Sequence, residues 1–220
     1  MKLSIGAVML VAALVTPLVG AAQEAELSAN IGVVSEYFYR GLVQKGVGGR
    51  TEGASASAGL DLTVSKVYLG TWAADVGDGN EVDVYAGIGT EVNDFSVSVG
   101  GTGYFYTGGF EDTSLEANLN AGYGPVSAEF SYGRYKAAAG DQDYWFLAGT
   151  VEQWGLYGTF GTFGKDFNGE YFEAGYEVSV GALDLMAAWI YTTDALLVTP
   201  DLGNNTLVFG ISHTFDIDLN

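Results

Sequence analysis

Cysteine is absent from this sequence of 220 residues, which also has only three prolines and one histidine. Without cysteine there is no disulfide and no thiolate metal site, so stability must come from packing or from surrounding lipid. Basic residues are scarce as well: 8 Lys and Arg stand against 27 Asp and Glu, for a net charge of −19. Such a chain repels phosphates, which argues against nucleic acid as a partner.

Long hydrophobic runs are missing after residue 22. The one apolar run, residues 5–19, is shorter than the roughly 20 residues of a membrane-spanning helix. It follows Lys2 and precedes the small residues 20–22, the arrangement of a cleaved signal peptide. We therefore predict a signal peptide over residues 1–22 and one domain over 23–220, with a retained N-terminal membrane helix as the less favoured alternative.

The mature chain has instead a repeated alternation of apolar and polar residues in segments of about ten. Residues 54–64 and 115–123 show it clearly, because Ala, Leu and Val alternate there with Ser, Gly, Asp and Asn. Successive strand residues point to opposite faces, so one row can face lipid and the other a polar interior. With no helix-length apolar run, a spanning form must be a closed barrel. The pattern predicts an all-β, closed antiparallel transmembrane β-barrel of about 12 strands, the first over residues 27–39.

The breaks between these segments alternate between short and long, as in outer-membrane barrels. Tight turns are predicted at Ser65 and Lys66, Asn93 and Asp94, Gly124 and Pro125, Glu152 and Gln153, and Gly181 and Ala182. Longer connections are predicted at residues 41–51, 76–80, 107–113, 137–143, 164–169 and 193–204. This order places both termini on the periplasmic side. The rows are less distinct in residues 144–151 and 156–163, where both are apolar.

Charged side chains fall on the polar row of the predicted strands, which keeps them away from hydrocarbon. The resulting candidates for lumen charges are Glu36, Arg40, Asp61, Glu81, Asp83, Glu116, Glu129, Glu173, Glu177 and Asp184. Glu36 and Arg40 lie about 13 Å apart along a strand, so each needs partners on other strands. Either these charges select permeating solutes, or they form an internal network that fills the lumen.

Aromatic residues gather near the predicted strand ends, as in the aromatic girdles of membrane interfaces. Toward the long connections these are Tyr37, Tyr39, Tyr104, Phe105, Tyr106, Tyr132, Tyr135, Tyr144, Tyr171, Trp189 and Tyr191. Toward the tight turns they are Phe95, Tyr123, Trp154 and Phe215. A soluble sandwich would bury its aromatic residues at strand centres, so this placement favours the barrel.

Three segments resemble one known family. Residues 28–44 (SANIGVVSEYFYRGLVQ), residues 57–62 with 67–74, and residues 80–87 are similar to the TorF-type porins, outer-membrane proteins of Gram-negative bacteria. The resemblance implies a porin-like barrel in the outer membrane, with lipid and the barrel-insertion machinery as partners. It also allows a homo-oligomer, which is common among porins, but it indicates no substrate.

Catalytic and metal-binding interpretations are weaker. His213, the one histidine, lies on an apolar row, where packing at the membrane interface is favoured over catalysis. The pairs Glu81 with Asp83 and Glu173 with Glu177 have the spacing of neighbouring same-face residues, but no motif marks a substrate cleft. The acidic loop from Asp75 to Asp83 offers oxygen ligands for calcium without the EF-hand spacing, so calcium binding there stays open. We predict no enzyme activity, no cofactor and no metal site.

Two functions follow from this interpretation. The favoured one is a porin-like channel for passive passage of small solutes, whose acidic lumen prefers cations or neutral molecules to anions. The alternative is a non-conducting structural barrel, or one that binds partners through its loops. In that alternative, inward Tyr85, Tyr157 and Phe163 close the pore.

Overall fold

The computed structural model describes residues 25–44, 53–109, 112–196 and 204–219. Within these ranges no helix is long and apolar enough to span a membrane. The predicted signal peptide and parts of the predicted loops 41–51 and 193–204 lie outside them. The strands are β1 (Ala25–Val34), β2 (Phe38–Tyr39), β3 (Leu42–Val43), β4 (Ser55–Val64), β5 (Val67–Asp75), β6 (Asn80–Val92), β7 (Phe95–Tyr106), β8 (Ser114–Tyr123), β9 (Val126–Tyr135), β10 (Gln142–Gln153), β11 (Leu156–Lys165), β12 (Gly169–Val180), β13 (Leu183–Thr192) and β14 (Asn205–Ile217), with a short 3-10 helix, η1 (Asp194–Leu196), before β14.

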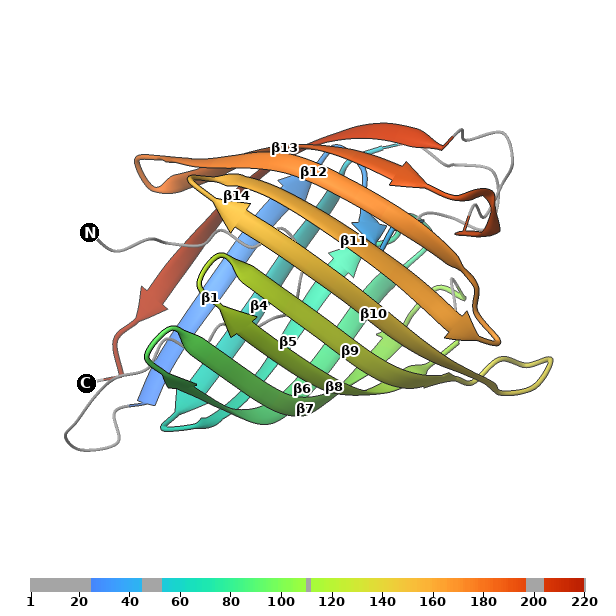
Figure 1. Ribbon diagram of the computed structural model, residues 1–220, viewed down its shortest axis with the longest axis horizontal. Helices are drawn as coiled ribbons and strands as arrows, with labels where there is room; N and C mark the ends of the chain where they lie inside the picture. Colours follow the sequence, from blue (N-terminus) through green and yellow to red (C-terminus); the bar gives the residue numbers. More distant parts are fainter. Residues whose placement is uncertain (1–24, 45–52, 110–111, 197–203, 220) are drawn as a thin grey trace.

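Twelve of these strands form one closed barrel (Figure 1). Each barrel strand pairs antiparallel with its sequence neighbour, and β1 closes the ring by pairing with both β14 and β4. The strands β2 and β3 pair only with each other, as a separate two-stranded sheet. The all-β closed barrel of twelve antiparallel strands confirms the predicted fold class.

The barrel wall is apolar outside and polar inside. Val84 and Leu119 are 49% and 48% exposed on the outer face, whereas Glu81 and Asp83, on the other row of β6, are 1% and 2% exposed. Large apolar side chains are exposed along every barrel strand. A water-soluble protein buries such residues, so this inverted distribution is that of a barrel with hydrocarbon outside.

The tight turns at one end of the barrel were predicted well (Figure 1, left). Four lie where expected, with positive φ at Ser65, Asn93, Gly124 and Gly181. The fifth prediction, at Glu152 and Gln153, was wrong, because β10 continues to Gln153. Its turn is formed by Trp154 and Gly155, with φ of 57° and 82°, since glycine adopts this left-handed conformation without steric cost. β1 begins and β14 ends at this same end, which we call the turn side; the opposite end is the loop side.

The first strand is shorter than predicted. It ends at Val34 instead of Tyr39, and the chain then forms the hairpin of β2 and β3. Arg40 and Gly41 form the turn of this hairpin, with φ of 50° and 78°. A two-residue turn with two positive φ values matches the twist of paired short strands. The alternation of residues 27–39 therefore belongs to two structural elements.

Many aromatic residues assigned to the loop-side girdle are instead inside the barrel. Tyr37, Tyr104, Tyr144 and Tyr171 are all buried within the barrel, because they stand on the hairpin or on inward rows of the wall. The prediction was wrong for them, and Tyr39, Tyr106 and Tyr135 also pack against inner clusters. The remaining aromatic residues of the two predicted girdles have exposed side chains: Phe105, Tyr132, Trp189 and Tyr191 on the loop side, and Phe95, Tyr123, Trp154 and Phe215 on the turn side.

Candidate functional site: a hairpin inside the barrel

The segment Tyr37–Gln44, which contains β2 and β3 and is here called the inner hairpin, lies within the lumen. Tyr37 donates a hydrogen bond of 2.7 Å from its hydroxyl to Glu81 on β6. On another side, the Thr192 hydroxyl of β13 donates to the Gly41 carbonyl at 2.9 Å. Both wall residues are on inward rows. Arg40 of the hairpin contacts β8. In the ring, β8 and β13 are separated by four strands on one side and six on the other, so they lie on nearly opposite sides of the barrel. The hairpin therefore spans the lumen.

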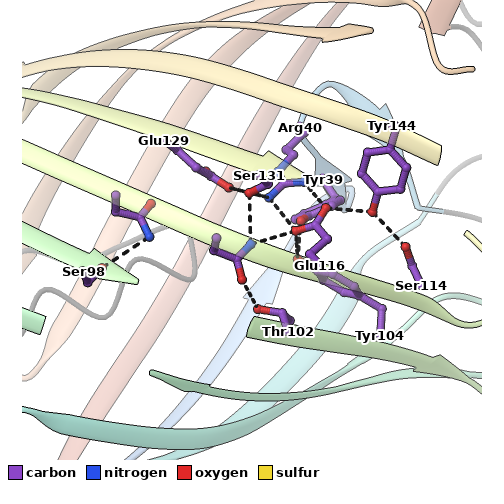
Figure 2. Close-up of polar contacts among 12 residues, drawn as sticks. Tyr39, Arg40, Ser98, Thr102, Tyr104, Ser114, Glu116, Glu129, Ser131 and Tyr144 are labelled. Atoms are coloured by element: carbon purple, nitrogen blue, oxygen red, sulfur yellow. Dashed lines mark hydrogen bonds and ion pairs between the residues drawn. The ribbon is translucent and has the colours of Figure 1, made fainter. Parts of the chain in front are cut away.

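Arg40, at the tip of this hairpin, is 8% exposed and forms the centre of the polar contacts (Figure 2). Its Nη1 and Nη2 donate to the two carboxylate oxygens of Glu116 at 2.6 and 3.0 Å. Nη2 also bridges to Glu129 and donates to the Ser131 hydroxyl at 3.1 Å. A bidentate guanidinium–carboxylate pair is among the strongest and most directional polar contacts in proteins. Arg40 thus joins the hairpin to β8 and β9.

A second set of side chains holds the two carboxylates in place. Tyr104 and Tyr144 donate their hydroxyls to Glu116 at 3.0 and 2.7 Å, and the Asn118 amide donates to it at 3.0 Å. Ser131, which is fully buried, donates to Glu129 at 2.9 Å. Both oxygens of Glu116 and Oε1 of Glu129 therefore accept at least two hydrogen bonds each (Figure 2). These polar partners could not be predicted from the sequence, because no pattern marks a tyrosine or serine as part of a network between distant strands.

Negative charge exceeds positive charge inside the loop-side half of the barrel. Glu81, Asp83, Glu116 and Glu129 are buried there, while Arg40 is the one buried basic residue in the described part of the chain. Burial disfavours the charged guanidinium, but attraction by Glu116 and Glu129 outweighs this effect and raises the pKa of Arg40 well above its ordinary value. Arg40 therefore remains a cation at any pH the protein meets.

Apolar contacts complete the fit of the hairpin. Leu42 packs against the inner cluster that contains Phe146 and Phe163, and Phe38 packs against the inner cluster that contains Ile190. The Arg40 guanidinium also lies over the Phe146 ring, with its Cζ 4.2 Å from the ring centroid. This packing explains why both rows of residues 144–151 and 156–163 are apolar: one row faces outward, and the other covers the hairpin.

The turn-side half of the lumen has a different lining. Its inward residues are mostly small or polar and only half-buried, so solvent reaches them, whereas inward residues around the hairpin are buried. Asp61, between these two zones, accepts hydrogen bonds from Tyr85 and, at 3.3 Å, from Asn30. Representative half-buried residues of this half are Asn30, Ser98, Asn120, Thr150 and Ser212.

The other predicted lumen charges are distributed around the wall. Glu173 accepts a hydrogen bond of 2.6 Å from Tyr157, and Asp184 accepts one of 2.5 Å from Ser179. Glu177 is half-buried on the inward row of β12. The prediction for Glu36 was wrong: this residue lies in the bend after β1, not on the interior row of the first strand. Arg40 is likewise on a turn, and its partners come from β8 and β9 instead of the strands next to β1.

The weaker chemical candidates do not converge on a site. His213 contacts the Ala182 carbonyl through Nδ1, and its ring packs edge-on against Phe215 at 4.2 Å. In the acidic loop, Asp75 accepts a hydrogen bond from the Gly77 backbone, whereas Asp83 points into the barrel. The described residues contain no group of three or more His, Cys, Asp or Glu side chains placed to hold a metal ion.

Comparison with solved structures shows the fold at low sequence identity. A chain from a study of the in-meso crystallization of membrane proteins has a TM-score of 0.61 at 10% identity, covering 89% of this chain and 85% of that one. Pseudomonas aeruginosa OccK2 (OpdF) in complex with glucuronate has a TM-score of 0.41 at 13% identity, covering 79% of this chain and 61% of that one. A BenF-like porin from Pseudomonas fluorescens has a TM-score of 0.41 at 11% identity, covering 79% and 58%.

Sequence comparison gives a family. A family model described as a bacterial protein of unknown function (Gcw_chp) matches residues 19–215. No curated protein matches the chain.

Proposed function

The chain belongs to the Gcw_chp family of bacterial proteins, and we propose that it is an outer-membrane channel for the passive passage of small solutes. The observation that carries this proposal is the sorting of side chains by the barrel wall. Apolar residues face outward, and carboxylates with small polar residues face an interior that solvent reaches from the turn side. A barrel that served only as a membrane anchor would not need a hydrated lumen.

The charge of the lumen sets the expected selectivity. Carboxylates on β4, β6, β8, β9, β12 and β13 point inward, and Arg40 is the one basic residue that contacts them in the described chain. Rings of carboxylates attract cations and repel anions in water-filled pores. We therefore propose that small cations and neutral solutes pass in preference to anions.

A non-conducting barrel is the second candidate, and the inner hairpin is the observation that favours it. The hairpin forms hydrogen bonds with inward residues on β6, β8, β9 and β13. Its Leu42 and Phe38 also pack against two of the inner apolar clusters. Tyr85, Tyr157 and Phe163 were predicted to close the pore in this alternative. Tyr85 and Phe163 are buried within the same half, whereas Tyr157 is half-buried at the turn-side start of β11. In this candidate the barrel acts through its outer loops.

Planar-bilayer recording separates the two functions. Purified protein is reconstituted, and single-channel currents are recorded in a KCl gradient. The channel proposal expects discrete conductance steps and a reversal potential of the sign given by cation preference. Anion preference would contradict the acidic-lumen proposal. Absence of current from the wild-type protein and from variants that release or remove the inner hairpin would favour the non-conducting barrel.

The location in the cell is proposed on the same basis. We expect cleavage after residue 22, insertion by the barrel-insertion machinery and residence in outer-membrane lipid, and the TorF-type resemblance supports this route. Fractionation together with N-terminal sequencing of the mature protein tests it: the protein should sediment with outer membranes and begin at Gln23. Crosslinking in the membrane tests whether it is a homo-oligomer.

A further inference from the structure

The inner hairpin is not part of the barrel wall. Its two short strands pair only with each other, and no barrel strand extends its ladder to them. Val34, the last residue of β1, connects it to the wall on one side. It is therefore held inside the lumen mainly by side-chain contacts. Such an element can leave its position while every hydrogen bond of the barrel ladder stays intact.

Among those contacts, Arg40 makes the only ion pairs between the hairpin and the wall in the described chain. The pairs are buried, so salt in solution screens them weakly. Removing the guanidinium would leave Glu116 and Glu129 buried without a cation, a strongly unfavourable arrangement. Water entering the loop-side half would relieve that penalty, so loss of Arg40 favours a hydrated lumen over a packed one.

We propose that the inner hairpin occludes the loop-side half of the lumen and that Arg40 holds it there, which makes Arg40 the residue that sets the conductance. The inference rests on the proposed channel function, because conductance has meaning only if solutes pass. It also accounts for both candidate functions. The barrel is closed while the hairpin lies in the lumen, and it is open when the hairpin is displaced. Arg40 acts through the hairpin and is a positioning residue.

Conductance measurements test the inference directly. We expect Arg40→Ala to raise the single-channel conductance several-fold, and Arg40→Lys, which keeps the charge but not the bidentate geometry, to give a smaller rise. Lys66→Ala is the matched control, because Lys66 is an exposed cation in a tight turn outside the lumen, and its conductance should equal that of the wild type. Heat-dependent gel mobility verifies that each barrel is folded. If Arg40→Ala does not fold, replacement of residues 37–44 by a Gly-Ser linker tests the same occlusion.

A second readout does not depend on current. Because the chain has no cysteine, Ser98→Cys places a single thiol on the half-buried inward row of β7, four residues after Asp94 of the tight turn and therefore on the turn side of the hairpin. A small cationic thiol reagent added outside intact cells should label this thiol slowly in the wild-type background and much faster with Arg40→Ala. Ala138→Cys, in the exposed loop after β9, should be labelled equally fast in both.

The outcomes separate this inference from the channel proposal. Equal conductance of the wild type, Arg40→Ala and the linker variant would overturn the inference and leave the channel standing. Absence of current from every folded variant would overturn the channel, and the labelling rates would then decide whether the hairpin occludes the lumen. Equal labelling of the Ser98→Cys thiol in both backgrounds would show that it does not.

Discussion

Arg40 and Glu116 are joined by two hydrogen bonds of 2.6 and 3.0 Å, although 76 residues separate them in the chain. The pair connects the tip of a hairpin to the opposing wall of a barrel, and Glu129 extends it to the next strand. Because both side chains are buried, each charge needs the other as its partner. Four predictions follow from this pair, from the hairpin turn and from the barrel wall.

The charge pair predicts non-additive effects on stability. Arg40→Met leaves two carboxylates buried without a cation and should lower the free energy of unfolding by roughly 3–5 kcal/mol. Adding Glu116→Gln removes one stranded charge, so the double variant should be more stable than Arg40→Met alone. Urea unfolding of the refolded barrel in lipid vesicles measures both values. Simple addition of the two single effects would show that the residues are not coupled.

The hairpin turn predicts a difference between two glycines with the same φ. Gly41 and Gly109 both have φ of 78°, but a Cβ on Gly41 would lie 2.7 Å from Tyr171 Cγ, whereas nothing lies within 4 Å of one on Gly109. Gly109→Ala should cost about 1 kcal/mol from backbone strain alone. Gly41→Ala should cost clearly more and raise the conductance. Similar losses in both variants would mean that the tip does not pack against β12.

The barrel wall predicts opposite tolerance of charge on its two rows. Leu119→Arg, on the outer face of β8, should destabilise the barrel by roughly 2–4 kcal/mol if the position lies near the bilayer midplane. Ser57→Arg, on the inward row of β4, should cost far less because this half-buried position faces the polar lumen and not hydrocarbon. Folding titrations into vesicles measure both. Equal losses would contradict the assignment of outward and inward rows.

The hairpin predicts insensitivity to alkaline pH. The pKa of Arg40 is raised well above its ordinary value, since its attraction to Glu116 and Glu129 outweighs burial, and burial with nearby Glu81 raises the pKa of Tyr37. For a group with a raised pKa in the folded state, its stabilisation is complete below the unfolded pKa and is lost only as pH rises through the folded one. Both values lie above pH 10, so neither side chain changes its charge between pH 7 and 10. Asp83→Asn removes a buried carboxyl that acts on Tyr37, so in this variant the conductance should stay constant over that range. A rise across that range in Asp83→Asn would contradict the role of Arg40.

Local patterns were sufficient to predict the wall of the barrel. Alternation over residues 54–64 and 115–123 placed Leu60 and Leu119 outward and Asp61 and Glu116 inward, because strand geometry alone puts neighbours on opposite faces. Turn residues located four of the five tight turns in the same way. The error at Trp154 arose because a tryptophan in a turn with positive φ carries no propensity signal. Gly155, which follows it, was the usable indication.

The interior was less predictable because the same alternation serves two environments. Tyr37 and Tyr144 have the strand-end positions of girdle residues, yet both are buried inside the barrel. A row that faces inward and a row that faces an interface have the same composition when the inside contains a packed hairpin. Gly41, between two short apolar pairs, was the one local signal of a tight turn, but the longer alternation of residues 27–39 concealed it.

By itself the sequence determined which side chains face lipid and which face the lumen, because that choice depends only on the two-residue period of a strand and on the cost of charge in hydrocarbon. Only the tertiary structure decided that Arg40 meets Glu116 and Glu129. That contact depends on closure of the ring and on the fold of one hairpin into it, which bring residues from β8 and β9 to a turn that follows β1. The two-residue period of a strand carries no information about a contact between residues 76 positions apart.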